Sequence, residues 1–226
     1  MRLLNWNILA GGGARTPDII QRIDHHAPDI CLISEYRAGS VGNILKAKMS
    51  DIGLPFHADA GSLPSQNSVC IFSRFPLSAV QVSVVPHLIE RHVVCRKVED
   101  IIVIGAFCAT PTIGSQFLTY LTTLPSAFPD VSIIATGDFF FGARGSNHEF
   151  YASLDCLRLS GWIDMWRLSR GSELFWSFQS GRGKSQPDHI FCSGPISRCT
   201  MSVDFSMTEL DMMLSDHAPM LAQFES

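Results

Sequence analysis

Short apolar runs rich in β-branched and aromatic residues recur along the whole chain, and they constrain the fold more than any other feature. Runs of this kind, bounded by Gly, Pro, Asn and Ser, are typical of β-strands. Several are continuously apolar, as expected for strands that are covered on both faces. The predicted strands span residues 3–9, 30–34, 68–73, 79–85, 93–98, 101–108, 131–136, 189–192 and 219–224.

Helical patterns are fewer than strand patterns. They lie at residues 17–26, 44–49, 115–124 and 148–160. Because some predicted strands follow one another directly, a plain doubly wound parallel sheet is disfavoured. We expect two mixed β-sheets packed face to face, with helices outside. No internal repeat and no Pro-, Gly- or Ser-rich linker divides the chain, so we expect a single domain over residues 1–226.

Composition narrows the class of protein. Of the 226 residues, 46% are hydrophobic and only 17% are charged, which predicts a large core. The formal charge of −4 argues against a protein that coats nucleic acid electrostatically. The seven cysteines are scattered without a C-x-x-C pair, which predicts reduced core residues in a cytoplasmic protein. The uncharged stretch 101–129 contains three prolines, so we expect no membrane span there.

Polar residues lie at or next to the ends of several predicted strands, where a rigid scaffold usually presents a site. These residues are Asn7, Glu35, Asp138, Asp188 and the pair Asp216-His217. Taken singly, such a Glu is equally a solvated loop carboxylate, and Ser-Asp-His is equally a turn or helix cap. Together the carboxylates suit a hard cation such as Mg²⁺. No H-x-x-x-H or H-E-x-x-H motif is present, so a zinc hydrolase is disfavoured.

The order of short motifs along the chain is more specific than any one motif. They are N-W-N at 5–7, D-I-C-L-I-S-E-Y-R at 29–37, S-V-C-I-F-S-R-F-P-L at 68–77, I-I-A-T-G-D-F at 133–139, G-W-I-D-M-W-R at 161–167, P-D-H-I-F at 187–191 and S-D-H-A-P at 215–219. In this order they resemble the endonuclease/exonuclease/phosphatase superfamily over nearly the whole chain. That family includes exonuclease III-like and DNase I-like nucleases, sphingomyelinases and inositol-polyphosphate phosphatases. The resemblance implies a DNase I-like four-layered α/β sandwich and hydrolysis of phosphoester bonds with a divalent metal, Mg²⁺ or Mn²⁺.

The resemblance also implies roles for individual residues. Glu35 matches the metal-binding Glu, and Asp216 matches an Asp close to the metal. Asn7 matches the Asn that organises metal and phosphate. Asp138 matches the Asp that orients or deprotonates the attacking water.

A buried acid and an imidazole complete the implied catalytic set. His217 matches the His that contacts the scissile phosphate, and Asp188 matches the Asp that hydrogen-bonds to it. Such an Asp fixes the tautomer of the imidazole and favours its charged form. We therefore expect Asn7, Asp138, Asp188 and His217 to be catalytic.

Two positions depart from the family pattern. Phe140 stands where the Asn of G-D-F-N is expected, and Phe107 aligns with a His or Tyr that donates to the phosphate. Losing one such donor commonly lowers kcat by about 10² to 10³. The alternative function is therefore a catalytically impaired relative that binds a phosphate-containing ligand or a protein partner without turnover.

The sequence indicates the type of reaction more clearly than the substrate. The candidate substrate-binding residues are Arg37, Arg144 and Lys184. They would form only a small basic surface, for a nucleic acid or for a small phosphodiester. Trp176 lies close to the expected site and has two interpretations: it stacks on a base of the substrate or, as we favour, it is a core residue beneath the site.

Overall fold

The structure of the protein is a computed structural model. It describes residues 1–80, 85–139, 154–171, 173, 175–181, 183–199 and 201–225. Within these ranges, no helix has the length and apolar character needed to cross a membrane.

The described strands form two six-stranded mixed sheets and a short hairpin. The first sheet has the order β13 (Met201–Phe205), β14 (Met220–Phe224), β1 (Arg2–Asn7), β2 (Ile30–Tyr36), β4 (Ser68–Ser73) and β3 (Phe56–Asp59). The second has the order β5 (Leu77–Ser78), β6 (Val93–Val98), β7 (Ile101–Phe107), β8 (Ser132–Asp138), β12 (Asp188–Ser193) and β9 (Ile163–Asp164). The hairpin pairs β10 (Phe178–Ser180) with β11 (Gly183–Ser185). The pairs β1–β2 and β7–β8 are parallel, and the other pairs are antiparallel.

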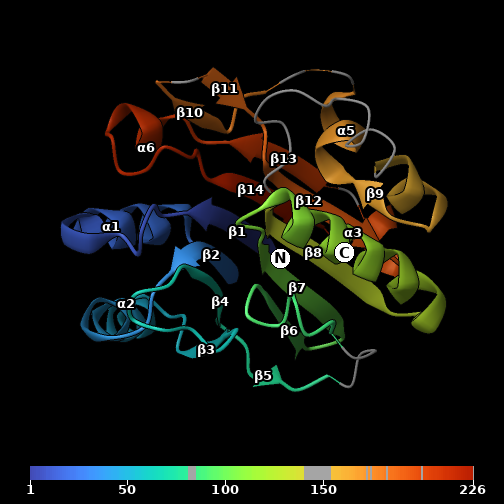
Figure 1. Cartoon of the computed structure of the whole chain (residues 1–226), viewed down its shortest axis with the longest axis horizontal. Coiled ribbons are helices and arrows are strands. Elements are labelled where there is room, and N and C mark those ends of the chain that lie inside the picture. The colour runs from blue at the N-terminus through green and yellow to red at the C-terminus, as the bar shows by residue number, and fades with distance from the viewer. Residues whose placement is uncertain are drawn as a thin grey trace.

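Helices cover the outer faces of both sheets (Figure 1). The helical elements are η1 (Gly13–Arg15), α1 (Thr16–His26), α2 (Ser40–Asp51), α3 (Pro111–Ala127), a helix at 154–159, α5 (Met165–Arg170), η2 (Pro195–Arg198) and α6 (Thr208–Asp211). Helices α1 and α2 pack on the first sheet through Ile19 and Leu45, and α3 packs on the second through Phe117 and Leu121. The layers are therefore helix, sheet, sheet and helix, so the expected two packed mixed sheets flanked by helices are confirmed.

A buried core fills the space between the two sheets. Leu32 and Ile71 of the first sheet pack there with Val103, Ile134 and Ile190 of the second. The close approach of the sheets explains a glycine in β7. A Cβ added at Gly105 would lie 2.0 Å from Leu32 Cδ1, so a larger residue would push the sheets apart.

Strand alternation directs polar residues into the same inter-sheet space. In β1, Leu3 belongs to the core between the sheets, whereas Leu4 and Trp6 face the helices. Because side chains alternate along a strand, Asn5 and Asn7 share the inward face with Leu3. The polar end of this inward face is where the candidate site forms.

The structure corrects three of the predicted elements. The strand predicted at 79–85 is wrong for residues 79 and 80, which belong to no strand, and residues 81–84 lie outside the described residues. The helix predicted to end at 124 continues through Pro125 to Ala127. Proline removes the N–H that would bond the Leu121 carbonyl, and that carbonyl instead accepts the indole N–H of Trp162 at 2.8 Å. The predicted helix at 148–160 is helical over 154–159, and its first six residues lie outside the described ranges.

Candidate functional site

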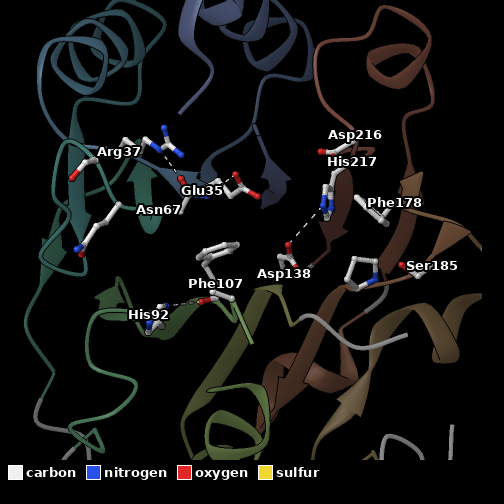
Figure 2. A pocket seen from close by; sticks show the side chains of 14 residues that line it. Glu35, Arg37, Asn67, His92, Phe107, Asp138, Phe178, Ser185, Asp216 and His217 are labelled. Atoms are coloured by element: carbon white, nitrogen blue, oxygen red, sulfur yellow. Dashed lines mark hydrogen bonds and ion pairs between the residues drawn. The ribbon is translucent and has the colours of Figure 1, made fainter. Parts of the chain in front are cut away.

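A cavity of about 730 Å³ opens at the polar end of the inter-sheet space (Figure 2). Both sheets, their loops and the β10–β11 hairpin contribute to its wall. Among the lining residues are Glu35, Arg37, Asn67, His92, Phe107, Asp138, Phe178, Ser185, Asp216 and His217. The cavity therefore gathers the polar residues that lie far apart in the sequence.

Asn7, at the end of β1, joins three of the predicted site residues. Its Nδ2 donates to Asp138 Oδ2 at 2.9 Å and to Glu35 Oε1 at 3.2 Å, and lies 3.4 Å from His217 Nε2. Its Oδ1 accepts the backbone N–H of Leu9, which fixes the amide orientation. Asn7 is fully buried, so its position is set by packing as well as by these bonds.

Glu35 reaches the cavity because the backbone is distorted at that residue. The β2–β4 register shifts between Ser34 and Tyr36, which marks a β-bulge, and Glu35 has φ of 57°. A bulge redirects a side chain, and a non-glycine residue in the left-handed region carries strain that the surroundings must offset. The Glu35 carboxylate accepts three N–H donors: Asn7 Nδ2, the Ala10 backbone at 2.7 Å and Asn67 Nδ2 at 2.7 Å.

His217 and Asp188 form a buried pair. The Nδ1 of His217 donates to Asp188 Oδ2 at 2.8 Å. The same oxygen accepts the Ser177 hydroxyl at 2.7 Å, and Asp188 Oδ1 accepts Asn5 Nδ2 at 3.4 Å. Because a carboxylate only accepts, Nδ1 of His217 carries a proton and Nε2 faces Asp138, 3.8 Å from its Oδ2.

The carboxylates around His217 favour its charged form. Burial alone would lower the pKa of this imidazole, but the charge of Asp188, the hydrogen bond to it, and the charges of Asp138 and Asp216 outweigh burial and raise the pKa to about 9. His217 is thus a cationic donor at neutral pH. Its backbone is also anchored, because its carbonyl accepts Trp6 Nε1 at 2.9 Å.

Asp216 provides an oxygen that fits a cation. Its Oδ1 is buried and has no hydrogen-bond partner among the described residues. A buried carboxylate oxygen without a donor is unfavourable unless a cation or water completes it. In the described part of the chain no group of three or more His, Cys, Asp and Glu is arranged to hold a metal. Glu35 and Asp216 line the same cavity and carry the hard oxygen donors of which Mg²⁺ takes one or two, with water and phosphate in its other positions.

The structure separates the three basic residues that were predicted to bind substrate. Arg37 lines the cavity. Lys184 is exposed on β11, beside the lining residue Ser185 but outside the lining itself. Arg144 lies outside the described residues. The prediction that Trp176 is buried in the core is wrong, since this side chain is 44% exposed.

Phe107 lies in the cavity wall, as the alignment of β7 predicts, and Phe140 lies outside the described residues. Next to Phe107 is a histidine that the sequence analysis missed. His92 Nδ1 donates to the Phe107 carbonyl at 3.1 Å, and the two rings lie 6.4 Å apart. Burial lowers the pKa of His92, while its hydrogen bond to the Phe107 carbonyl opposes this shift. The sequence marks His92 only as the residue before an apolar run, so no pattern singles it out.

Comparisons with known proteins agree with this fold. A model of the endonuclease/exonuclease/phosphatase family matches residues 4–217. An AP endonuclease from Archaeoglobus fulgidus superposes with a TM-score of 0.81 at 17% identity, over 100% of both chains. A 3′-5′ exonuclease from Neisseria meningitidis gives 0.81 at 20% identity, and a Neisseria 3′ phosphatase bound to a product DNA hairpin gives 0.81 at 18%, each again over 100% of both chains. No curated protein matches the sequence.

Proposed function

Because the chain belongs to the endonuclease/exonuclease/phosphatase family, we propose that it hydrolyses phosphodiester bonds with the help of a divalent metal ion. The observation that carries the proposal is the convergence of Asp138 and His217 in one cavity, with Asn7 bonded to Asp138 and Asp188 buried behind the imidazole. This set supplies an acceptor for water and donors for phosphate. Those are the groups that in-line displacement by water requires.

Each of these side chains has a defined task in the proposed reaction. Asp138, held by the Asn7 amide, accepts a hydrogen bond from the attacking water and aligns it. His217 donates from Nε2 to a non-bridging oxygen of the phosphate. Because negative charge on that oxygen grows in the transition state, the imidazolium stabilises the transition state more than the ground state. Asp188 keeps the imidazole charged and fixes its orientation.

Glu35 and Asp216 would hold Mg²⁺ or Mn²⁺, since both are hard oxygen donors that line the same cavity. When bound, the ion supplies positive charge to the phosphate oxygens. The unpartnered Asp216 oxygen supports this assignment.

The substrate we propose is a nucleic acid or another accessible phosphodiester. The Neisseria 3′ phosphatase was solved with a product DNA hairpin, and it shares this fold. Among the described Lys and Arg residues, Arg37 lines the cavity and is placed to contact a substrate phosphate, and Lys184 and Arg144 are the remaining candidates. All seven cysteines are free, which supports a reducing compartment such as the cytoplasm.

A second candidate function is binding without turnover. It is favoured by Phe107, which lines the cavity and brings no polar atom to the wall where a donor is expected. A chain of this kind would keep affinity for phosphate while losing rate, because uniform binding of phosphate does not accelerate the chemical step.

One assay separates the two functions. Hydrolysis of a generic phosphodiester and of single- and double-stranded DNA is measured with Mg²⁺, Mn²⁺ or EDTA, for wild type and for Asp138→Asn. We expect metal-dependent turnover that EDTA and the substitution both abolish. Binding of the same DNA with no turnover above that of Asp138→Asn would favour the impaired relative.

A further inference from the structure

Asn67 uses both ends of its amide to connect two charged residues of the site. Its Oδ1 accepts Arg37 Nε at 2.6 Å, and its Nδ2 donates to Glu35 Oε2 at 2.7 Å. Such lengths are typical of charge-assisted hydrogen bonds. Figure 2 shows the three side chains together on one side of the cavity, opposite His217.

The stem of Arg37 is held as well as its head. A Cβ added at Gly11 would lie 3.1 Å from Arg37 Cβ and 3.3 Å from its Cγ, so the aliphatic part of Arg37 packs against the β1–η1 loop. Gly11 has φ of +75°, a conformation that favours glycine at this close approach. The guanidinium therefore enters the cavity from a fixed direction, with Nε already engaged by Asn67.

Asn67 also separates the charges that it connects. Arg37 and Glu35 are two residues apart, and the described residues include no ion pair between them. A direct pair would neutralise both groups. The neutral amide holds the two side chains in register while leaving the guanidinium charge for an anion and the carboxylate charge for a cation.

We propose that Asn67 is a positioning residue that presents Glu35 to the metal ion and Arg37 to a substrate phosphate. The proposal rests on the proposed function, because it assigns Asn67 to the same site. If the proposal is right, a single substitution of Asn67 affects both metal binding and substrate binding. Partners that orient a metal ligand in this way commonly contribute about 10-fold to 100-fold in metal affinity.

The test uses Asn67→Ala, Arg37→Ala and the double variant, with Asn43→Ala on the exposed face of α2 as the matched control. Calorimetry measures Mn²⁺ affinity without substrate, and steady-state kinetics on a phosphodiester give KM and kcat. Thermal unfolding checks that each variant is folded. We expect Asn67→Ala to weaken Mn²⁺ binding about tenfold and to raise KM. Arg37→Ala should raise KM with Mn²⁺ affinity within about twofold of wild type.

The double variant decides whether the two residues act together. Its KM should not exceed that of Arg37→Ala, because Asn67 affects the substrate through Arg37 and interacting residues are not additive. The role of Asn67 would be overturned if the KM increases of the two single variants multiplied in the double variant. It would also be overturned if Asn67→Ala bound Mn²⁺ as tightly as Asn43→Ala. Either outcome would leave the proposed function intact. A wild type that binds no Mn²⁺ would instead overturn the proposed metal dependence, and the inference with it.

Discussion

Replacing Asp188 by Asn should uncouple His217 from the charge that keeps it protonated. Asp188 is 1% exposed and accepts the imidazole Nδ1–H at 2.8 Å. The rise in the His217 pKa from 6.5 to about 9 corresponds to about 3 kcal/mol of preference for the charged imidazole. This is a net value, because Asp188, Asp138 and Asp216 together raise the pKa and also offset the burial that lowers it. In Asp188→Asn, burial acts against the charged form and the pKa should fall toward 6.5.

The sign of the stability effect follows from the direction of this shift. A group whose pKa is raised on folding stabilises the fold fully below its unfolded value, here 6.5. That stabilisation is lost as the pH rises through the folded value of about 9. Wild type should therefore lose stability between pH 6.5 and 9 through this residue, and Asp188→Asn should lose less over the same range.

NMR titration of the metal-free protein measures the His217 pKa directly, with His217→Gln used to assign the signal. Urea unfolding at pH 6 and pH 10 measures the stability difference. The matched control is Asp204→Asn, which removes the same charge from a side chain that is 66% exposed. The reasoning fails if His217 titrates near 6.5 in wild type, or if its pKa is the same in Asp188→Asn as in wild type.

Four further outcomes are expected. Glu35→Gln should weaken Mg²⁺ or Mn²⁺ binding at least about tenfold by calorimetry, because it removes an anionic ligand; equal affinity would refute the metal assignment. Burial raises the pKa of Glu209, but hydrogen bonds from His26, Ser206 and Arg22 outweigh burial and lower the pKa to about 2. The stability that Glu209 contributes should therefore be lost as the pH falls from 4.5 to 2. Urea unfolding curves for Glu209→Gln should show a smaller loss over this range. Gly105→Ala should destabilise the fold by about 1–3 kcal/mol in urea unfolding, because the added Cβ would meet Leu32; an unchanged midpoint would contradict the close sheet contact. Phe140→Asn should raise kcat by about 10-fold to 10³-fold if a nucleophile-orienting amide is what the chain lacks; a folded variant with no more activity than Asp138→Ala would refute that account.

The positions of the long strands were predictable because they follow from local pattern. An apolar run identifies β4 with its observed bounds, and β6 keeps its predicted bounds although Arg96 and Lys97 interrupt its apolar run. The polar residue at a strand end identifies Asn7 and Asp138. The inward face is set by the two-residue period of a strand, which a sequence displays directly. The family motifs consist of these strand runs and the polar residues at their ends, so their order along the chain indicates the family.

The missed elements depend on contacts that are distant in the sequence. β9 has two residues and exists because it pairs with β12. α6 carries Glu209, which accepts Arg22 Nε and lies 2.8 Å from His26 Nε2, 187 and 183 residues away. No local pattern encodes such a partner. For the same reason, the sequence does not single out Asn67. Its two hydrogen bonds are made to Glu35 on β2 and to Arg37 in the loop that follows β2.

The structure favours a working site over an inherited remnant because it retains several unfavourable features in one place. Glu35 adopts φ of 57°, and Leu9 and Ala10 of the adjoining loop adopt 54° and 53°. Single residues held in that region cost on the order of 1–3 kcal/mol each. Asp216 adds a buried oxygen without a partner among the described residues. A chain released from binding phosphate and metal would gain stability by replacing these residues, so their joint presence supports a site that still binds a ligand.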